Sequence, residues 1–274
     1  MSAERIIDTG TDQLRCTVRD QVAIITLNRP EARNALSAEL SPALRRMVAH
    51  CAGDDGVRAV MVTGAGTAFC AGGDVKNMGD RRVATDDTVD ERFRIMQQRH
   101  QGTCGELRSL RKPTVAAMPG PAAGAGLALA LACDIRIASP NAFVSTGYAK
   151  IGLSGDYGIA WLLTRTVGPA KAREIMLTSE RIEAAKAAEI GIISRIVPAE
   201  TLQSEAFALA RSLAEGPAVA LGYIKDNLDE AFDVSYRTAI DREAMRMLLT
   251  QGTEDHKEAV RAFVDKRKPA FKGR

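Results

Sequence analysis

The first half of the chain alternates short, mostly apolar runs with segments of helical periodicity. The apolar runs at residues 22–27, 59–63 and 114–118 have the length of buried strands. From 40 to 48, leucine, methionine and valine recur at spacings of four, seven and eight, which predicts a helix that Ser37 caps at its start. Strand–helix–strand units of this kind predict a layered α/β fold, with parallel strands and helices on the faces of the sheet.

The second half of the chain becomes mostly helical. Apolar residues repeat at helical spacing over 202–213, and two further helices are expected at about 236–249 and 254–265. We therefore expect an α/β core over residues 1–198 and a C-terminal helical region over 199–274.

A charged segment and a helix lie between the second and third apolar runs. Residues 79–88 are mostly polar and lack periodicity, so we expect a mobile loop there. The helix that follows is expected to turn Val89, Phe93 and Met96 inward, because their spacing places them on one helical face.

The uncharged run from Thr114 to Cys133 is long enough to raise the question of a membrane span. It is interrupted by Pro119, Gly120 and Pro121 and is rich in alanine. A buried strand, a tight turn and a buried helix explain it better, so we expect no membrane span.

Composition excludes several other classes of protein. The chain has 274 residues, of which 46% are hydrophobic, enough for a sizeable core. Its 37 basic and 34 acidic residues are too balanced to indicate nucleic-acid binding. Residues 1–8 lack the apolar stretch of a secretion signal. The five cysteines are odd in number and scattered, which favours reduced thiols in a cytoplasmic protein over disulfides or a zinc site.

Two segments of small residues follow buried strands. The first is Phe69–Val75, with the sequence Phe-Cys-Ala-Gly-Gly-Asp-Val, and the second is Pro119–Gly126. Small residues at the start of a helix let a ligand approach unpaired N–H groups at the positive end of the helix dipole. Two such donors from different segments can hold an oxyanion. The alternative is that the small residues only allow close packing of helix and strand.

Taken together, the motifs resemble those of the crotonase superfamily, the enoyl-CoA hydratase/isomerase family. Four segments carry the resemblance in the family's order: Ile25–Leu36, Phe69–Met78, Lys112–Asp134 and Ala262–Pro269. The resemblance implies a crotonase-like spiral of ββα units, with C-terminal helices that pack in a homotrimer or a hexamer made of two trimers. It also implies an acyl-CoA thioester substrate, with no metal and no cofactor besides the CoA of the substrate.

The resemblance assigns the two oxyanion donors to the N–H groups of Ala71 and Ala125. Such donors polarise a thioester carbonyl and stabilise an enolate, and one donor typically contributes about 3–4 kcal/mol. Many members of the family have glycine where this chain has Ala125. Alanine can serve there if its φ is negative, because only the N–H is needed.

The resemblance also implies contacts with the CoA moiety. These positions are Arg29 and Ala32 for the nucleotide and pantetheine, Gly72, Gly73 and Asp74 on the adenine-facing turn, and Phe263 and Lys266 for the CoA of a neighbouring subunit. Phe263 and Lys266 also have a simpler interpretation. A phenylalanine on a helix face is commonly a core residue, and a lysine near a terminus is commonly solvated.

The catalytic carboxylates differ from the hydratase pattern. Hydratases of the family use two glutamates to activate water and protonate the α-carbon. Those positions fall at Ala128 and at Tyr148, or at Gly147 if the alignment shifts by one residue. A two-glutamate hydration mechanism is therefore not supported.

One acid remains in a suggestive place. Asp156 lies in Ile151–Gly158 and matches family members in which a single aspartate moves a proton between two carbons of the substrate. Burial that raises its pKa would suit this role. The alternative is that Asp156 caps the helix expected to begin near Tyr157.

Other side chains with reactive groups have simpler readings. Tyr148 is expected to line the core or a pocket, although its hydroxyl could contribute to the site. His50, His100 and His256 lack metal-ligand spacing and are expected to be surface or packing residues. Cys70 is expected to be a small buried hydrophobic residue.

The sequence thus predicts an enoyl-CoA thioester enzyme that works through an enolate, with double-bond isomerisation favoured over hydration. A non-catalytic acyl-CoA-binding protein of the same fold is the alternative. Gly64-Ala65-Gly66 after a strand suggests a dinucleotide-binding oxidoreductase, but Phe69 occupies the place of the third glycine.

Overall fold

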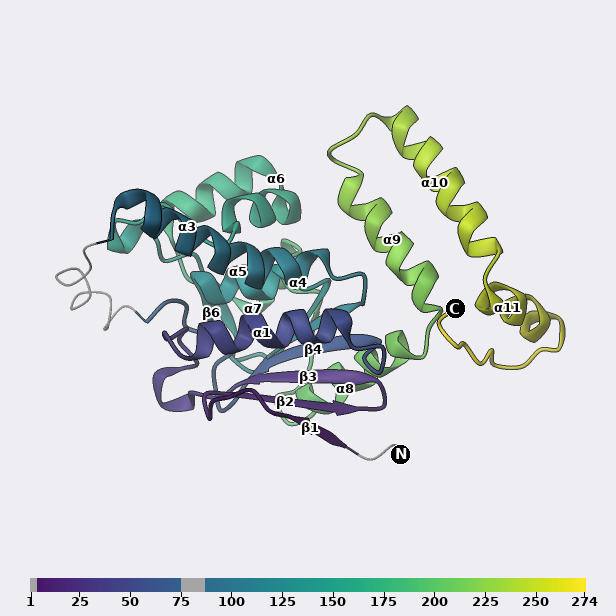
Figure 1. Ribbon diagram of the computed structural model, residues 1–274. Coiled ribbons are helices and arrows are strands. Elements are labelled where there is room, and N and C mark those ends of the chain that lie inside the picture. Colours follow the sequence, from purple (N-terminus) through teal and green to yellow (C-terminus); the bar gives the residue numbers. More distant parts are fainter. Residues whose placement is uncertain (1–3, 75–86) are drawn as a thin grey trace.

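The computed structural model describes residues 4–74 and 87–274 and contains two sheets (Figure 1). The main sheet has the strand order β1-β2-β3-β4-β5-β7-β10, and the small sheet has the order β6-β8-β9. The strands of the main sheet are Arg5–Ile7, Leu14–Arg19, Val22–Leu27, Ala59–Gly64, Thr114–Met118, Ile135–Ala138 and Arg195–Ile196. Those of the small sheet are β6 (Ala122–Ala123), β8 (Phe143–Ser145) and β9 (Ile182–Glu183).

Successive turns of the chain contribute to both sheets. After a short turn, β5 is followed by β6 and β7 is followed by β8. Isolated bridges from Leu36 to Gly73 and from Cys70 to Ala122 extend the small sheet to the two preceding turns. The chain is therefore a spiral of repeated units, each with a long strand, a short strand and a helix. The strands β3, β4, β5, β7 and β10 are parallel, as the sequence predicted.

Both faces of the main sheet are covered by helices. Successive side chains of a strand point to opposite faces of its sheet, so β4 contributes to the core on both faces. Val60 and Val62 join the core of α1 (Leu40–Gly53) and α5 (Ala125–Ala132). Met61 joins a second cluster under α8 (Leu202–Ala214). The N-cap residue of α1 is Glu39 and not Ser37 as predicted, although Ser37 Oγ accepts hydrogen bonds from Glu39 N and Leu40 N at 3.2 and 2.9 Å just before the helix.

The remaining helices complete the layers. They are η1 (Pro30–Ala32), α3 (Val89–His100), the π-helical turn η3 (Gln101–Gly105), α4 (Glu106–Ser109), η4 (Ala149–Ile151), α6 (Ile159–Thr178) and α7 (Ala184–Glu189). No helix within the described ranges is long and apolar enough to cross a membrane. The uncharged run that begins at Thr114 resolves into β5, a turn, β6 and α5. All five cysteines are buried and free of disulfides.

The division between core and helical region lies further along the chain than expected. The helix α8 follows residue 198, yet Leu202, Ala206 and Ala210 are buried against the main sheet. The separate part begins after Gly216 and consists of α9 (Ala218–Glu230), α10 (Tyr236–Gln251) and α11 (Glu254–Val264). These three helices, which we call the C-terminal arm, project to one side of the core (Figure 1).

The expectation for α3 is wrong. Val89, Phe93 and Met96 are 71%, 62% and 53% exposed. The stripe is flanked by charged residues, and no described residue of α3 is buried. Burial begins in the π-helical turn η3, at Thr103 and Cys104. Most of the loop expected at 79–88 lies outside the described residues.

Candidate active site

The loop after β3 is fixed by a buried asparagine that the sequence analysis did not single out. Asn34 is fully buried with φ 58°, and its Oδ1 accepts a hydrogen bond from Arg29 N at 2.9 Å. Its Nδ2 donates to the carbonyl oxygens of Ala65 and Ala68 at 2.9 and 2.8 Å. Asparagine tolerates a left-handed backbone better than most residues. An asparagine in the loop that follows a strand is therefore the feature of the sequence that could have indicated this turn. The side chain joins the loop to the turn after β4.

Two of the residues assigned to CoA binding form an ion pair. Arg29 Nη1 and Nη2 both lie 3.3 Å from Asp74 Oδ2, and Nη1 also donates to the Ala35 carbonyl at 2.7 Å. Ala32 lies on η1 in the same loop and is half-buried. The structure therefore brings Arg29, Ala32 and Asp74 together.

The assignment of an oxyanion donor to Ala71 needs a correction. Its N–H is already donated to the Arg33 carbonyl at 2.9 Å, so it cannot serve a ligand in this conformation. The N–H of Gly72 is donated to the Cys70 thiol. The first N–H of this turn without a partner among the described residues belongs to Gly73.

The direction of the Gly73 N–H follows from the small sheet. Leu36 N donates to the Gly72 carbonyl at 2.7 Å, which makes Leu36 and Gly73 neighbours in a parallel bridge. The Gly72 carbonyl and the Gly73 N–H belong to one trans peptide group, in which the C=O and N–H bonds point in opposite directions. The N–H of Gly73 therefore faces away from Leu36, toward the side on which Ala122 pairs with Cys70.

The start of α5 lies against this same segment. A Cβ on Gly72 would be 2.7 Å from the Ala123 carbonyl oxygen and 3.5 Å from Ala125 N, so only glycine allows this approach. A Cβ on Gly126 would be 2.2 Å from the Cys70 carbonyl oxygen. Close packing is thus a real requirement here. It also brings the two segments of small residues together, as the sequence predicted.

Ala125 is the first residue of α5, and its φ is negative. The first N–H groups of a helix have no acceptor within the helix. The condition stated for alanine at this position is therefore met.

Asp156 is hydrogen-bonded to a tyrosine. Tyr148 Oη donates to Asp156 Oδ1 at 2.5 Å. Burial raises the pKa of Asp156, which the Tyr148 hydrogen bond and the charges of His100 and Arg99 partly oppose. Burial also raises the pKa of Tyr148, so its hydroxyl remains a neutral donor.

Asp156 does not cap the helix that follows it, so the alternative interpretation of this residue is wrong. The helix α6 begins at Ile159, its N-cap residue is Gly158, and no side chain caps it. The Asp156 carbonyl oxygen accepts from Ile159 N at 3.1 Å, while the carboxylate is directed to Tyr148.

A chain of contacts joins the carboxylate to the start of α5. A Cβ on Gly124 would lie 3.7 Å from Tyr148 Oη, so the hydroxyl lies beside the residue that precedes Ala125. Gly72, Ala125, Tyr148 and Asp156 therefore belong to one site, although they come from three different turns of the spiral.

A histidine from α3 also reaches this site. The His100 ring packs on Tyr157 with 4.2 Å between ring centroids and an angle of 41° between the planes. Burial lowers the pKa of His100, and the Asp156 charge opposes that shift. The expectation of a packing residue is thus confirmed for His100. Its nearness to Asp156 was missed, because helical periodicity says nothing about contacts across turns of the spiral.

Other predicted residues lie as follows. Cys70 is fully buried, and burial raises the pKa of its thiol to about 12, which confirms its reading as a small packing residue. Phe263 and Lys266 are exposed at the end of the C-terminal arm, away from the other site residues of the same chain (Figure 1). Their contact with a neighbouring subunit stays a prediction.

Comparisons with known proteins agree on one family. Residues 17–274 match the family model described as enoyl-CoA hydratase/isomerase. The 1,2-epoxyphenylacetyl-CoA isomerase of Escherichia coli (strain K12) is 36% identical over 257 residues, which are 94% of this chain and 97% of that protein. The mitochondrial enoyl-CoA hydratase of Pongo abelii is 35% identical over 251 residues, 92% of this chain and 83% of that protein.

A solved structure gives the same result. The crystal structure of an enoyl-CoA hydratase from Bacillus anthracis superposes with a TM-score of 0.88 at 29% sequence identity. The superposition covers 96% of this chain and 100% of that chain. The similarity therefore includes the core and the C-terminal arm.

Proposed function

The chain belongs to the enoyl-CoA hydratase/isomerase family and has its crotonase-like fold, and we propose that it shifts the double bond of an enoyl-CoA thioester. The resemblance seen in the sequence is confirmed, and so is the expectation of an enzyme of the hydratase/isomerase type. Which reaction it catalyses is the subject of the proposal. The observation that carries it is the single carboxylate, Asp156, held by Tyr148 beside the start of α5.

The proposed oxyanion donors are the N–H groups of Gly73 and Ala125. Gly73 replaces Ala71 in this role, because the Ala71 N–H is donated to Arg33. Main-chain donors that are fixed before the substrate arrives need no reorganisation when negative charge develops on the thioester oxygen. The small sheet and the packing of Gly72 and Gly126 provide this rigidity.

Asp156 is the proposed proton carrier. Its carboxylate removes a proton from the α-carbon of a 3-enoyl-CoA, and the electron pair moves into a dienolate whose oxygen is held by the two N–H groups. The protonated Asp156 then returns the proton to the γ-carbon, as the electron pair re-forms the carbonyl and leaves a double bond between the α- and β-carbons. One group suffices for both transfers, and burial poises its pKa toward the neutral range that such a carrier needs.

Tyr148 is the proposed positioning residue. It occupies one oxygen of Asp156, so the other oxygen is the one that can meet the substrate. Within the described residues, no second carboxylate influences the pKa of Asp156 or His100. This favours a one-carboxylate shuttle over hydration, which needs a base for water and a separate acid.

The CoA moiety is proposed to lie along Arg29, Ala32, Gly72, Gly73 and Asp74. The loop of Arg29 and the turn of Asp74 are already joined by their ion pair. A phosphate of CoA would compete with Asp74 for the guanidinium, which can bind two oxygen atoms side by side.

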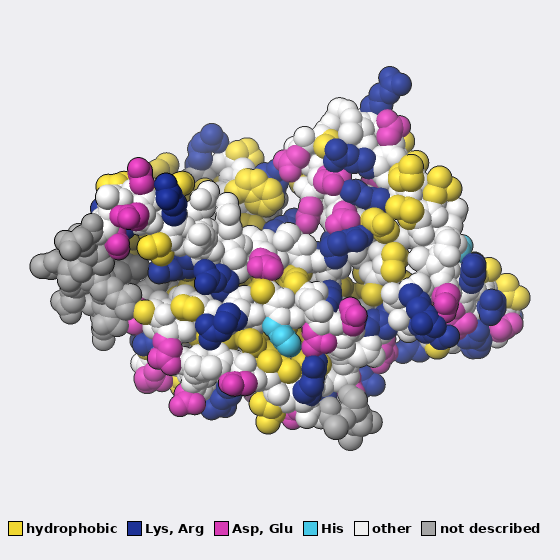
Figure 2. All heavy atoms as spheres, in the orientation of Figure 1, with side chains coloured by type: hydrophobic (Ala, Val, Ile, Leu, Met, Phe, Trp, Pro, Cys, Tyr) yellow, Lys and Arg dark blue, Asp and Glu magenta, His cyan; other side chains and the backbone are white. Residues whose placement is uncertain are grey.

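A homotrimer or a hexamer is proposed for the assembled enzyme. Hydrophobic side chains are exposed along the C-terminal arm (Figure 2). Those on α10 are Tyr236, Ile240, Met245, Met247, Leu248 and Leu249. An apolar surface of this extent is typical of a protein interface. Phe263 and Lys266 would then approach the CoA of a neighbouring subunit.

The test compares two reactions and one pair of variants. We expect the enzyme to isomerise a 3-enoyl-CoA faster than it hydrates a 2-enoyl-CoA. Asp156→Asn is expected to lower isomerisation by about 100-fold or more. Asp55→Asn, an exposed aspartate on the core, is the matched control and is expected to retain full activity. Full activity of Asp156→Asn would refute the assignment, and tight acyl-CoA binding without any turnover would favour the non-catalytic alternative.

A further inference from the structure

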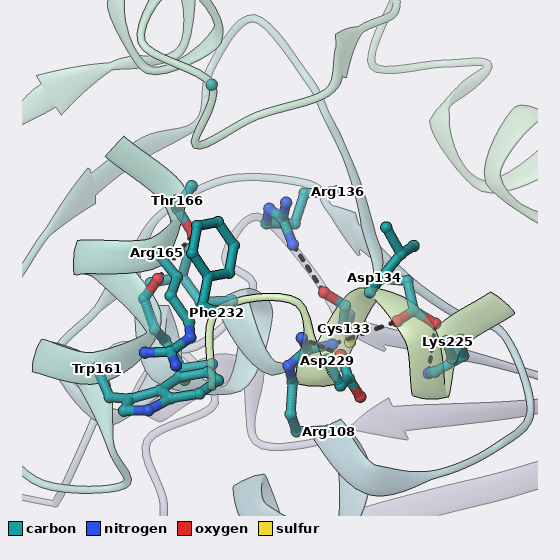
Figure 3. A pocket seen from close by; sticks show the side chains of 14 residues that line it. Arg108, Cys133, Asp134, Arg136, Trp161, Arg165, Thr166, Lys225, Asp229 and Phe232 are labelled. Carbon is teal, nitrogen blue, oxygen red and sulfur yellow. Dashed lines mark hydrogen bonds and ion pairs between the residues drawn. The ribbon is translucent and has the colours of Figure 1, made fainter. Parts of the chain in front are cut away.

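A second site is suggested by a cavity that the proposed reaction does not use. The cavity has a volume of about 410 Å³ and is lined by residues from α5, β7, α6 and α9 (Figure 3). This volume falls within the roughly 300–1,000 Å³ that is common for small-molecule sites. Asp156, Tyr148, Arg29 and Asp74 are not part of its lining.

Arg136 of β7 is a buried cation in this lining. It is only 9% exposed, its Nε donates to the Ile192 carbonyl at 2.6 Å, and its Nη1 donates to the Cys133 carbonyl at 2.7 Å. Among the described residues, no carboxylate forms an ion pair with it and no acceptor uses its Nη2. Burying a guanidinium without an anion is unfavourable, because the charge loses its hydration. An anionic ligand at Nη2 would offset this desolvation free energy.

The other cations of the lining are already neutralised. Each forms an ion pair with a carboxylate: Lys225 with Asp134, Arg108 with Asp229, and Arg165 with Asp233. The positive charge that remains belongs to Arg136. One negative charge would therefore balance the cavity, whereas a second would meet the carboxylates of Asp134 and Asp229.

One part of the cavity is apolar and aromatic. The guanidinium of Arg165 stacks on the Trp161 ring at 3.7 Å and lies 5.5 Å from the Phe232 ring centroid. Figure 3 shows Trp161, Arg165 and Phe232 on one side of Arg136 and the ion pairs of Asp134 and Lys225 on the other. A ligand with its charge at Arg136 would find apolar walls on only one side.

We propose that this cavity binds a small monocarboxylate with an aromatic or aliphatic body, at a site separate from that of the acyl-CoA. The carboxylate meets Nη2 of Arg136, and the body packs against Trp161, Phe232 and Leu228. A phosphate dianion fits less well because of Asp134 and Asp229. Two elements join this site to the reaction centre: α6 carries Trp161 and begins directly after the Asp156–Gly158 turn, and α5 carries Leu131 and begins at Ala125.

Calorimetry on the assembled, full-length protein tests the ligand class. The probes are benzoate and hexanoate, with benzamide as the neutral counterpart of benzoate and inorganic phosphate as the dianion. Benzoate or hexanoate is expected to bind, and benzamide and phosphate are expected to bind about tenfold more weakly or worse. A saturating acyl-CoA is expected to leave benzoate binding unchanged. Equal binding of benzamide, or displacement by the acyl-CoA, would overturn the proposal.

A matched pair of variants tests the location. Leu228 is 65% exposed on α9, so its substitution should leave the fold intact. Leu228→Glu places a negative charge at the cavity and is expected to weaken benzoate binding about tenfold or more, whereas Leu228→Gln is expected to change it about twofold or less. Unchanged binding in Leu228→Glu would overturn the proposal. So would the absence of carboxylate binding to the wild-type protein, the result expected if a second copy of the chain fills the cavity.

Discussion

Tyr148 donates its hydroxyl to Asp156 at 2.5 Å, and this hydrogen bond joins the carboxylate proposed for proton transfer to the start of α5. The tyrosine follows β8 and the aspartate precedes α6, so the pair closes one turn of the spiral. In one of the two alignments that the sequence leaves open, Tyr148 takes the place of a hydratase glutamate, and in the other Gly147 does. In the Tyr148 alignment, the tyrosine that stands in place of the glutamate is also the residue that positions Asp156.

The variant Tyr148→Phe tests this positioning. The hydrogen bond from Tyr148 lowers the pKa of Asp156, so its removal should raise that pKa further. Because Asp156 must be ionised to accept a proton, the acidic limb of the kcat/KM profile should move to higher pH. We also expect kcat to fall about tenfold, the loss typical of one hydrogen bond to a charged group.

The control for this prediction is Tyr157→Phe. The Tyr157 hydroxyl bonds to Ser41 and not to Asp156, so the acidic limb should stay in place. An unshifted limb in Tyr148→Phe, or an equal shift in both variants, would contradict a positioning role for Tyr148.

The oxyanion donor on α5 can be removed by proline. Ala125 is the first residue of α5, a helix position that tolerates proline because its N–H has no helical acceptor. Ala125→Pro should therefore lower kcat by roughly 100- to 1,000-fold with little loss of stability. Glu254→Pro at the first residue of α11 is the control for proline at such a position and should keep full activity. Near-normal turnover by a folded Ala125→Pro enzyme would remove Ala125 from the site.

Gly126 is predicted to be indispensable for packing. A Cβ there would lie 2.2 Å from the Cys70 carbonyl oxygen, so Gly126→Ala should force the two segments of the site apart. We expect a loss of about 1–3 kcal/mol in the free energy of unfolding, measured by urea denaturation. In Gly105→Ala the new Cβ has no neighbour closer than 3.8 Å, so this control should be neutral or slightly stabilising. If both variants unfold at the same urea concentration, the close approach is not what the glycine provides.

Asn34→Ala should destabilise the loop that carries Arg29. The substitution removes three hydrogen bonds from a fully buried side chain, two of which leave carbonyl oxygens without their donor. A loss of about 2–4 kcal/mol in the free energy of unfolding is expected. The exposed Asn141→Ala is the control and should lie within about 0.5 kcal/mol of wild type. A wild-type urea midpoint for Asn34→Ala would show that the loop is held by other contacts.

The pKa of Asp156 also predicts a dependence of stability on pH. Its pKa is raised in the folded protein, so the folded state holds this proton to higher pH than the unfolded state does. The contribution of Asp156 therefore becomes less favourable as the pH rises from below the unfolded pKa through the folded pKa. Relative to wild type, Asp156→Asn should be more stable at pH 7 than at pH 4, as measured by urea midpoints. A difference that is constant with pH would argue against a raised pKa.

Periodicity located the elements whose burial is regular along the chain. The strand at 59–63 and the helix over 40–48 were predictable because Val60, Val62, Leu44 and Val48 face one continuous core. Val89, Phe93 and Met96 also recur at helical spacing, but no other element within the described residues packs against them. The sequence alone does not distinguish such an exposed apolar face from a buried one. The helix α8 was assigned to the wrong part because its small apolar face, Ala206 and Ala210, gives no sign of the sheet beneath it.

The candidate site was predictable in type but not in its donors. The glycine- and alanine-rich segments indicated two main-chain donors, and they meet where a Cβ on Gly72 would touch Ala125 N. Which N–H is free depends on Arg33 and Leu36, whose carbonyl and N–H groups pair with this turn from an earlier turn of the spiral. The contribution of Asn34 has the same origin. Hydrogen bonds between different turns of the spiral are set by the fold, and they produce no recognisable residue spacing in the sequence.

The most direct test of the account follows the proton itself. A 3-enoyl-CoA deuterated at the α-carbon is incubated with the enzyme, and the products are followed by NMR. A single-carboxylate shuttle predicts a 2-enoyl-CoA with deuterium at the γ-carbon, because Asp156 removes and returns the same atom, and Asp156→Asn should form this product about 100-fold more slowly or less. Formation of a 3-hydroxyacyl-CoA as the first product, or a 2-enoyl-CoA with no deuterium at the γ-carbon, would contradict a single-carboxylate shuttle.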